Sequence, residues 1–313
     1  MFALVLSRIA VMVPNVIILT FLLFASVTSF LGTPAAIMLG EDASPESVAE
    51  LNARFGFDQP ILTRYWNWMS AALSGDLGRS YSTQQPVARM ITDALPLTLE
   101  LALWAILIAF FGAALINSAT FMKKSVDRFT SAVSIVGITV PNFFLGLLLI
   151  YLFSVQLRLL PTTGWSPWSN GAVQHLLHMI LPVATLSTFY FSSFSLVYKA
   201  EYQAVENSLF IRAARSKGLS EARISYRHIL PNSILPLITY AGLSLGQLVG
   251  GAVVTETVFS MPGMGRLLVD AISARDFPVM LAVGMVIIVG VMLLNLVADV
   301  TYSLVNPLVR TSA

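Results

Sequence analysis

Long stretches of apolar residues dominate the chain. A helix rises about 1.5 Å per residue, so about 20 apolar residues are needed to cross roughly 30 Å of hydrocarbon. Six stretches reach that length: Ile9 to Leu31, Leu97 to Ile116, Val133 to Val155, Leu176 to Tyr198, Ile234 to Thr255, and Val279 to about Val305. The pattern therefore predicts an all-α integral membrane protein with six transmembrane helices.

The composition agrees with a membrane protein. Of 313 residues, 56% are hydrophobic and 11% are charged, and the mean hydropathy is +0.78. So few charged groups do not cover the surface of a soluble domain of this size. The chain has no cysteine, which excludes disulfides, thiol nucleophiles and thiolate metal sites within it. The first apolar stretch, about 23 residues, exceeds the usual 7 to 15 of a signal peptide, so we expect it to be retained.

Positive charges favour one orientation in the membrane, because short cytoplasmic loops collect Lys and Arg. With the N-terminus inside, eleven cations lie on the inner side and three in short outer loops. The eleven are Arg8, Lys123, Lys124, Arg128, Lys199, Arg212, Arg215, Lys217, Arg223, Arg227 and Arg310, and the three are Arg158, Arg266 and Arg275. The other four cations lie in the long segment 32–96, and long loops cross largely regardless of charge. We therefore expect both termini in the cytoplasm.

Residues 32–96 form an outer segment for which the pattern predicts short amphipathic helices. In SPESVAELNARF, Ser44 is placed to cap a helix and Pro45 suits its first position. In QPILTRYWNWMSAAL, Tyr65 and Met69 recur at helical spacing among aromatic residues that suit a membrane interface. Packing on the outer mouth of the bundle is the simpler interpretation, and docking of an external partner is the alternative.

Prolines and glycines predict local geometry within the spans. Three prolines are expected to bend their helices because each removes a backbone hydrogen bond: Pro14, Pro141 and Pro182. In the fifth span, small residues recur every four positions at Gly242, Gly246 and Gly250, and such a stripe lets another helix approach closely. We expect this stripe to pack against a helix of this chain or of a partner.

Two patterns resemble chemical sites but favour structural roles. GLSLG around Ser244 fits a G-x-S-x-G nucleophile motif, which needs a strand, a sharp turn and a helix, yet it lies inside an uncharged apolar run. His175 and His178 could both contact a metal, but no carboxylate lies near them in the sequence to complete a site. We expect no catalytic residue and no metal site, and an interfacial histidine pair.

Ionisable residues inside spans are candidates for a solute pathway, because charges are costly in hydrocarbon. Three qualify: Glu100, Glu256 and Asp299. Each lies near an end of its span, so solvation or pairing in a structural role is the alternative to lining a pathway.

The one compact basic segment is RAARSKGLSEARISYRHILPNS, residues 212–233. At roughly 2.5 to 3.5 kcal/mol per residue, burying its five cations at mid-bilayer would cost on the order of 12 to 17 kcal/mol, so the segment is predicted to be cytoplasmic. The pattern predicts a helix before Gly218 and a second helix after it, beginning at Ser220 and ending at Pro231. Such an exposed elbow either binds a partner protein or rests on anionic headgroups.

The spacing in this segment resembles a known family. Permease subunits of ATP-binding-cassette importers carry E-A-A, three residues, G, nine residues and I-x-L-P; the matching residues are Ala213, Ala214, Gly218, Leu230 and Pro231. Arg212 replaces the glutamate and His228 the isoleucine. The variant ARSKGLS and the segments FGFDQPILTRYWNWMSAALSGDLGRSY, LPLTLELA and TETVFSMPGMGRLLVDAISARDFPVM resemble the first permease subunit of the dipeptide, oligopeptide and nickel importers.

The resemblance implies a type I importer permease fold in a bacterial or archaeal cytoplasmic membrane. Residues 1–31 are then the cytoplasmic N-terminus and first span, and residues 97–313 the core permease domain, with a coupling helix at about 209–229. The ATPase-coupling residues implied are Arg212, Ala213, Ala214, Arg215, Lys217, Gly218, Leu219, Arg223, Leu230 and Pro231. Gly218 is then expected because the turn needs either a positive φ or a close backbone contact. The implied partners are a second homologous permease, two ATPase subunits, an external solute-binding protein and membrane lipid, with no nucleic acid.

The chain has no G-x-x-x-x-G-K-[ST] phosphate loop, so it is predicted to bind no cofactor and to be no enzyme itself. ATP and Mg would be held by the partner ATPases, which drive alternating access for peptides or similar solutes. Dipeptides, longer peptides, nickel complexes, glycans and opine-like compounds stay open as cargo. The alternatives are a secondary transporter, which would show internal repeats and ionisable groups at mid-membrane, and an intramembrane hydrolase using Ser244.

Overall fold

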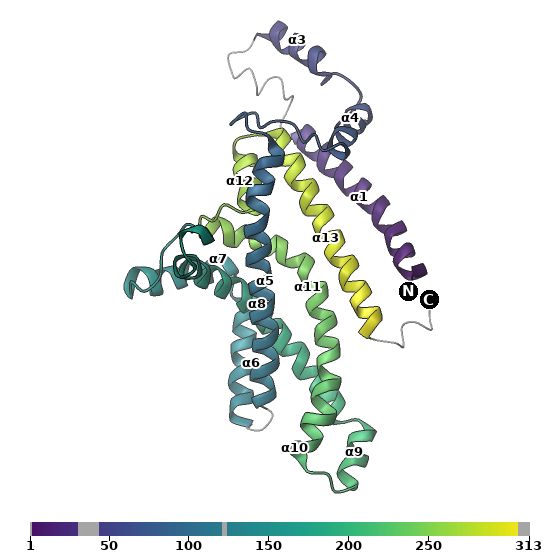
Figure 1. The fold of residues 1–313 in the computed structure, drawn as a ribbon, viewed down its shortest axis with the longest axis vertical. Coiled ribbons are helices and arrows are strands. Elements are labelled where there is room, and N and C mark those ends of the chain that lie inside the picture. The colour runs from purple at the N-terminus through teal and green to yellow at the C-terminus, as the bar shows by residue number, and fades with distance from the viewer. Residues whose placement is uncertain (1, 31–43, 121–123, 306–313) are drawn as a thin grey trace. The chain divides into compact units, whose positions relative to one another are not determined.

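The computed structural model describes residues 2–30, 44–120 and 124–305, and its regular elements in these ranges are helical. Leu31, Lys123, Arg310 and residues 32–43 of the outer segment lie outside them. The chain divides into two units, residues 1–98 with 262–292 and residues 99–261 with 293–313. Figure 1 shows the helices of each.

The first unit contains α1 (Phe2–Phe30), α3 (Pro45–Phe55), α4 (Ile61–Leu73) and α12 (Met264–Ser273), with the start of α5 (Val87–Thr120) and most of α13 (Phe277–Val305). Its core gathers apolar side chains from these helices, including Phe24, Tyr65, Met69 and Val283. A Cβ on Gly284 would lie 2.6 Å from Leu23 Cδ2, so α13 passes α1 closely.

The two predicted outer-segment helices are confirmed. The Ser44 side chain accepts a hydrogen bond from the backbone N–H of Ser47 at 3.2 Å, and Pro45 is the first residue of α3. Tyr65 and Met69 are buried along one side of α4. The amphipathic spacing therefore located both helices.

A buried carboxylate holds the loop that follows α4. Asp276, which is 2% exposed, accepts hydrogen bonds from the hydroxyls of Ser80 at 2.5 Å and Ser82 at 2.9 Å, and from the backbone N–H of Tyr81 at 3.1 Å. An antiparallel bridge between Arg79 and Pro86 closes the loop. Burial, together with the nearby Asp276 charge, raises the pKa of Tyr81.

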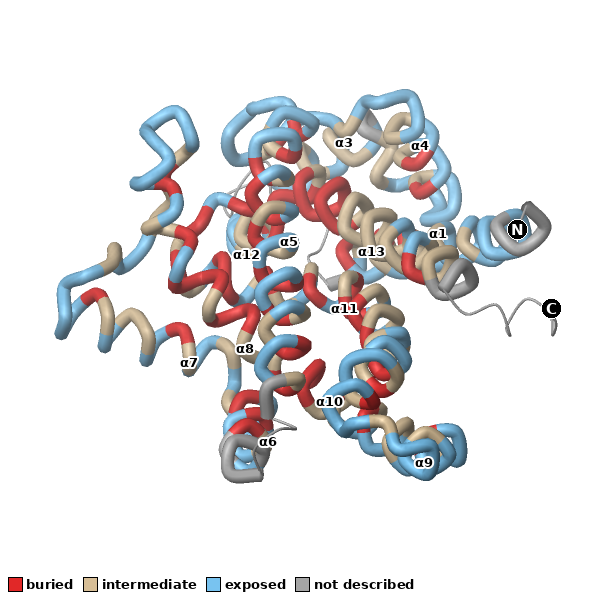
Figure 2. The backbone as a smooth tube through the Cα atoms, turned by 60° about the horizontal axis from the view of Figure 1, so that its bottom comes forward, coloured by how far each residue is buried: buried red, intermediate tan, exposed pale blue. Residues whose placement is uncertain are grey.

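The second unit contains the rest of α5, α6 (Lys124–Thr139), α7 (Asn142–Leu149), a π-helical turn (Ile150–Gln156), a 3-10 turn (Trp168–Asn170), α8 (Ala172–Glu206), α9 (Leu209–Ser216), α10 (Glu221–Ile224), a second π-helical turn (Ser225–Ile229) and α11 (Leu230–Val258). In this unit α8 packs most extensively against α11 and α6. Figure 2 shows buried residues along α8 and exposed residues on α9.

The third predicted span is not one straight helix, which corrects the expectation for Val133 to Val155. The segments Thr130–Thr139 and Asn142–Gln156 meet at an angle of 108°. Pro141 lies between them in an extended conformation, and a proline both lacks an N–H and disfavours helical backbone at the residue before it. In the described residues, five helices are long and apolar enough to span a membrane, or six if the bent pair is one span.

Several helices extend well beyond the predicted spans. The predicted outer segment ends at Pro96, yet α5 begins at Val87 and runs through that proline. Likewise α8 covers residues 172–206, whereas hydropathy indicated Leu176 to Tyr198. Hydropathy reports only the apolar part of a helix, and helical hydrogen bonding continues into polar flanks.

Candidate functional site

The candidate site is the elbow, residues 208–231 of the second unit, which joins α8 to α11. Helix α8 ends at Glu206, where the Ser208 hydroxyl donates to the Val205 carbonyl at 2.6 Å. Helix α9 then runs to Ser216, and Gly218 turns the chain with φ +75°. The predicted positive φ at this glycine is confirmed. A Cβ there would meet nothing within 4 Å, so backbone conformation and not close packing calls for glycine.

A small apolar core gives the elbow a fixed shape. Tyr202, Ile211, Ile224 and Ile229 are buried together, with Val205, Ala214 and Leu219 packed against them. The Tyr202 hydroxyl lies 3.1 Å from the Ser225 hydroxyl, which links the end of α8 to the π-helical turn. The two arms of the elbow therefore pack on each other.

Arg215 ties the arms together by charge. Its guanidinium donates to both Glu221 carboxylate oxygens, at 2.9 and 3.1 Å, and to Glu206 Oε1 at 3.2 Å. The Glu221 hydrogen bonds are the largest cause that raises the pKa of Arg215. This guanidinium thus bridges the end of α8 and the start of α10.

The second arm continues into the apolar helix, which corrects the predicted end at Pro231. Residues Glu221–Val258 form one helical run, and Pro231 lies in the first turn of α11. The π-helical turn Ser225–Ile229 ends two residues before this proline. Because i→i+5 bonding widens the turn, it accommodates a residue that lacks an N–H and needs room at the preceding carbonyls. Ser220 occupies the predicted cap position, but its side chain makes no capping hydrogen bond.

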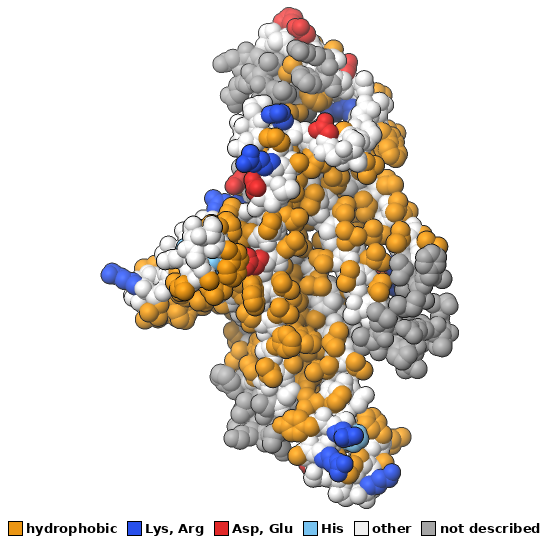
Figure 3. Space-filling view, in the orientation of Figure 1, with side chains coloured by type: hydrophobic (Ala, Val, Ile, Leu, Met, Phe, Trp, Pro, Cys, Tyr) orange, Lys and Arg blue, Asp and Glu red, His pale blue; other side chains and the backbone are white. Residues whose placement is uncertain are grey.

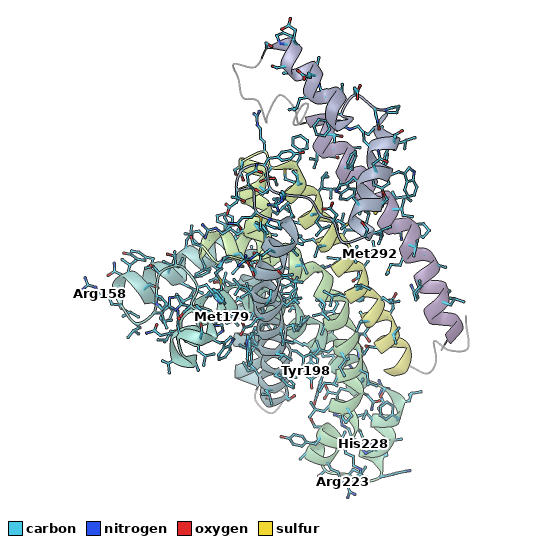
Figure 4. The ribbon with its side chains drawn as sticks, turned by 45° about the horizontal axis from the view of Figure 1, so that its top comes forward. Arg158, Met179, Tyr198, Arg223, His228 and Met292 are labelled. Carbon is cyan, nitrogen blue, oxygen red and sulfur yellow. The ribbon has the colours of Figure 1, made fainter. Side chains whose placement is uncertain are left out.

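The outer surface of the elbow combines cations with large apolar side chains. Besides Arg215, four cations are exposed: Arg212, Lys217, Arg223 and Arg227. Leu209 is 80% exposed, Phe210 50% and Tyr226 61%. Figure 3 shows blue Lys and Arg side chains over α9 and α10, and Figure 4 labels Arg223 and His228 there.

The ten residues predicted to contact an ATPase divide into two groups. Arg212, Ala213, Lys217, Gly218, Arg223 and Pro231 are exposed, whereas Ala214 and Leu219 pack on the elbow core and Leu230 is half-buried. Arg215, although exposed, engages the two glutamates. The motif did not predict the exposed side chains of Leu209, Phe210 and Tyr226 as part of the site. The helical spacing of LFIRAAR indicates which side chains face outward. Ile211 and Ala214 share the inner face, which leaves Leu209, Phe210 and Ala213 on the outer face.

Glu100, a candidate pathway residue, is paired within the second unit. Its Oε1 lies 3.0 Å from His175 Nε2 and accepts from Trp168 Nε1 at 3.2 Å. His175 is completely buried, with Nδ1 2.8 Å from the Ser166 carbonyl. His178 has a separate partner, the Gln174 carbonyl, which lies 2.8 Å from its Nδ1. The expectation that both histidines lie at the membrane interface stays a prediction.

The other two candidate pathway residues and the glycine stripe have varied surroundings. Glu256 is completely buried, and Asp299 is half-buried. A Cβ on Gly242 would lie 3.1 Å from Ala298 Cβ, one on Gly250 would meet nothing within 4 Å, and Gly246 is buried. In the described residues no group of three metal-ligating side chains is found.

Ser244 lies inside α11, where its hydroxyl donates to the Tyr240 carbonyl at 2.8 Å. A nucleophile elbow needs a sharp strand-to-helix turn, which a helix interior does not provide. The hydroxyl instead forms the i−4 bond that is ordinary for helical serine.

Residues 105–311, which include the elbow, match the family of binding-protein-dependent transport system inner membrane components, and residues 1–102 match its N-terminal region. The chain belongs to this family. It is 36% identical over 310 residues to the glutathione transport system permease protein GsiC of Escherichia coli K12, and 35% over 311 residues to that of Salmonella typhimurium LT2. Both alignments cover 98% of each chain.

Two solved structures share the permease fold. A crystal structure of an amino acid ABC transporter matches with a TM-score of 0.51 at 19% identity, over 72% of this chain and 94% of that one. An inward-facing structure of the MetNI methionine ABC transporter matches with a TM-score of 0.54 at 17% identity, over 70% and 96%. The expected type I importer permease fold is confirmed.

The permease is therefore the membrane subunit of an ATP-binding-cassette importer, and partner subunits hydrolyse the ATP. It is a multi-pass protein of the inner membrane. Family membership gives no support to the secondary transporter alternative.

Proposed function

We propose that the permease forms half of a heterodimeric pore for short peptides, and that the elbow transmits force from an ATPase. A second related permease, two ATPases that hold ATP and Mg, and an external solute-binding protein complete the transporter. Both termini and the elbow then lie in the cytoplasm, as the eleven to three distribution of cations favours.

The observation that carries the coupling role is the fixed, exposed shape of the elbow. Interfaces are enriched in aromatic residues and Arg at their centres, and the outer surface offers Phe210, Tyr226 and Arg212. The elbow is continuous with α11 and braced against α8 by Arg215. A push on the elbow therefore moves both long helices, which pack against each other.

Gly218→Val tests the coupling role. A β-branched residue is strained at φ +75°, so the turn should deform and the ATPase should no longer co-purify, although the permease stays in the membrane. Gly218→Asn is the matched control, because Asn tolerates the left-handed region. Gly164→Val places the same strain, at φ +94°, in open space outside the elbow and should spare ATPase binding. Unchanged ATPase recovery with Gly218→Val would show that the elbow is not the coupling site.

The orientation has a direct test because the chain has no cysteine. Ser216→Cys and Ser74→Cys replace exposed serines in the elbow and after α4. In intact cells, a membrane-impermeant maleimide should label position 74 and not position 216, and disruption of the membrane should expose position 216. Labelling of Ser216→Cys from outside would reverse the proposed topology.

The peptide class is supported by the glutathione permeases, since glutathione is a short peptide. Cells that depend on this transporter should take up labelled tripeptide, and excess unlabelled dipeptide or tripeptide should compete. Competition by free amino acids alone, with none by peptides, would contradict the proposed cargo.

A further inference from the structure

Helix α4 carries an apolar face that no described residue of the first unit covers. Leu62 is 59% exposed, Trp66 57% and Leu73 81%. Their spacing of four and seven residues puts them on one side of the helix. Tyr65 and Met69, which are buried, lie on the adjoining side that packs in the core.

Contacts between α4 and α1 show how far along α1 helix α4 lies. The Tyr65 hydroxyl lies 2.9 Å from Thr20 Oγ1 and donates to the Ile17 carbonyl at 3.1 Å. The apolar span of α1 is Leu6–Ser29, so Ile17 lies near its middle. At about 1.5 Å per residue, the two contacts lie roughly 14 to 18 Å from the Ser29 end. Figure 1 shows α4 beside the C-terminal half of α1.

This depth decides between two places for α4. A helix that lies on a membrane surface buries its apolar face only about 5 to 10 Å into the boundary of headgroups and acyl chains. Half of a hydrocarbon core of roughly 30 Å is about 15 Å, which is the level of the Tyr65 contact. The internal hydrogen bonds of Tyr65 suit this level, because hydrocarbon offers a hydroxyl no other partner.

The one charge of α4 points away from the apolar face. Arg64 lies about 200° around the helix from Leu62, on the helix side that lines a cavity of about 470 Å³ with Asn67, Trp68 and Asp76. Its guanidinium lies 5.8 Å from the ring centre of Phe24 and 5.6 Å from that of Phe57. The helix thus lies between an apolar surface and a cavity that polar and apolar side chains line together.

We propose that α4 is embedded in the leaflet that surrounds the C-terminal half of α1, with acyl chains covering Leu62, Trp66 and Leu73. On the topology proposed above this is the outer leaflet. The lipid face is continuous with α1, where Ile18 and Leu22 are exposed next to the residues that contact Tyr65. Part of the predicted outer segment is then a membrane element, and α3 is its water-exposed helix.

Nitroxide labels at Leu62→Cys and Trp66→Cys test this in membrane vesicles that hold the assembled transporter. Leu22→Cys is the lipid reference and Ser74→Cys the water reference. Labels at the two test positions should match the label at Leu22, with high accessibility to oxygen and low accessibility to a polar nickel complex. Leu73→Cys, on the same face, replaces either variant if that variant does not reach the membrane.

Two results would overturn the proposal. Nickel accessibility equal to that at Ser74 would put α4 in water, and low accessibility to both reagents would mean that a partner protein covers the face. The outcome is independent of cargo and ATPase binding. If α4 is not in lipid, the coupling role of the elbow is untouched.

Discussion

The Arg215 guanidinium and the Glu221 carboxylate form a bidentate pair across the glycine turn, with N–O distances of 2.9 and 3.1 Å. Two parallel hydrogen bonds fix both direction and distance, which a single contact does not. Glu206 binds the same guanidinium from α8. The motif spacing points to Arg215 as a contact for the ATPase, whereas its donors are used within the permease.

A charge swap tests this relationship. Arg215→Glu should place three carboxylates together and loosen the elbow, so amides of residues 209–221 should exchange hydrogen faster. Adding Glu221→Arg should restore most of the protection, because the pair is rebuilt in reverse. Arg223→Glu, an exposed cation on the same elbow, serves as the control and should leave exchange unchanged. Equal protection in the wild type and in Arg215→Glu would mean that the pair does not hold the elbow.

Asp276 is expected to matter for stability because its buried carboxylate gathers donors from Ser80, Tyr81 and Ser82. Asp276→Ala leaves those donors without an acceptor, which costs on the order of 1 to 3 kcal/mol for a buried group. The measurement is thermal unfolding of the purified permease.

Asp270→Ala is the matched control, since this carboxylate is 67% exposed and faces Arg266 at 3.6 Å. Exposed pairs of this kind contribute about 0 to 1 kcal/mol. If both variants unfold alike, the hydrogen bonds to Asp276 have no special importance for stability.

Glu100 distinguishes a structural anchor from a pathway residue. His175 Nδ1 faces a carbonyl, which only accepts, so Nδ1 carries a proton and Glu100 is the partner of Nε2. Glu100→Gln keeps a side chain that can hydrogen-bond His175 and Trp168, and we expect normal folding and uptake. Glu100→Leu should destabilise the permease by about 1 to 3 kcal/mol, because it strands a buried imidazole nitrogen.

The control for the two Glu100 variants is His178→Gln, because the His178 imidazole bonds the Gln174 carbonyl and not Glu100. Peptide uptake and thermal unfolding are measured together for each variant. Loss of uptake by Glu100→Gln with unchanged unfolding would assign the carboxylate to the pathway instead.

Signals that act within a few residues were readable from the sequence. The Ser44 cap, the positive φ of Gly218 and the break at Pro141 each depend on local backbone chemistry. Hydropathy likewise located every long helix, although not its ends. The elbow was recognisable because its glycine and cations stand close together in an apolar chain.

Pairings made by tertiary packing were not readable. Glu100 and His175 are 75 residues apart, and Ser80 and Asp276 are 196 apart, so no local pattern joins them. The use of Arg215 within the elbow depends on how α8 and α10 meet. The 108° bend at Pro141 exceeds an ordinary proline kink, and a proline in the sequence gives no angle.

The glycine stripe of α11 gives a final prediction, because two of its members have different surroundings. Gly242 faces Ala298, where a Cβ would lie 3.1 Å from Ala298 Cβ, whereas a Cβ on Gly250 would enter open space. Gly242→Val should overpack this contact and destabilise the permease by about 1 to 3 kcal/mol. Gly250→Ala should be neutral or stabilising by up to about 1 kcal/mol, since alanine favours helix.

Thermal unfolding of the permease measures both effects on stability. Co-purification of the second permease measures the effect of a Gly250 substitution on heterodimer assembly. If Gly250 faces that subunit, Gly250→Val should reduce heterodimer recovery while the unfolding of the isolated chain stays close to that of Gly250→Ala. Equal destabilisation by valine at 242 and 250 would contradict the asymmetry. It would mean that the face of α11 around Gly250 is packed within the chain.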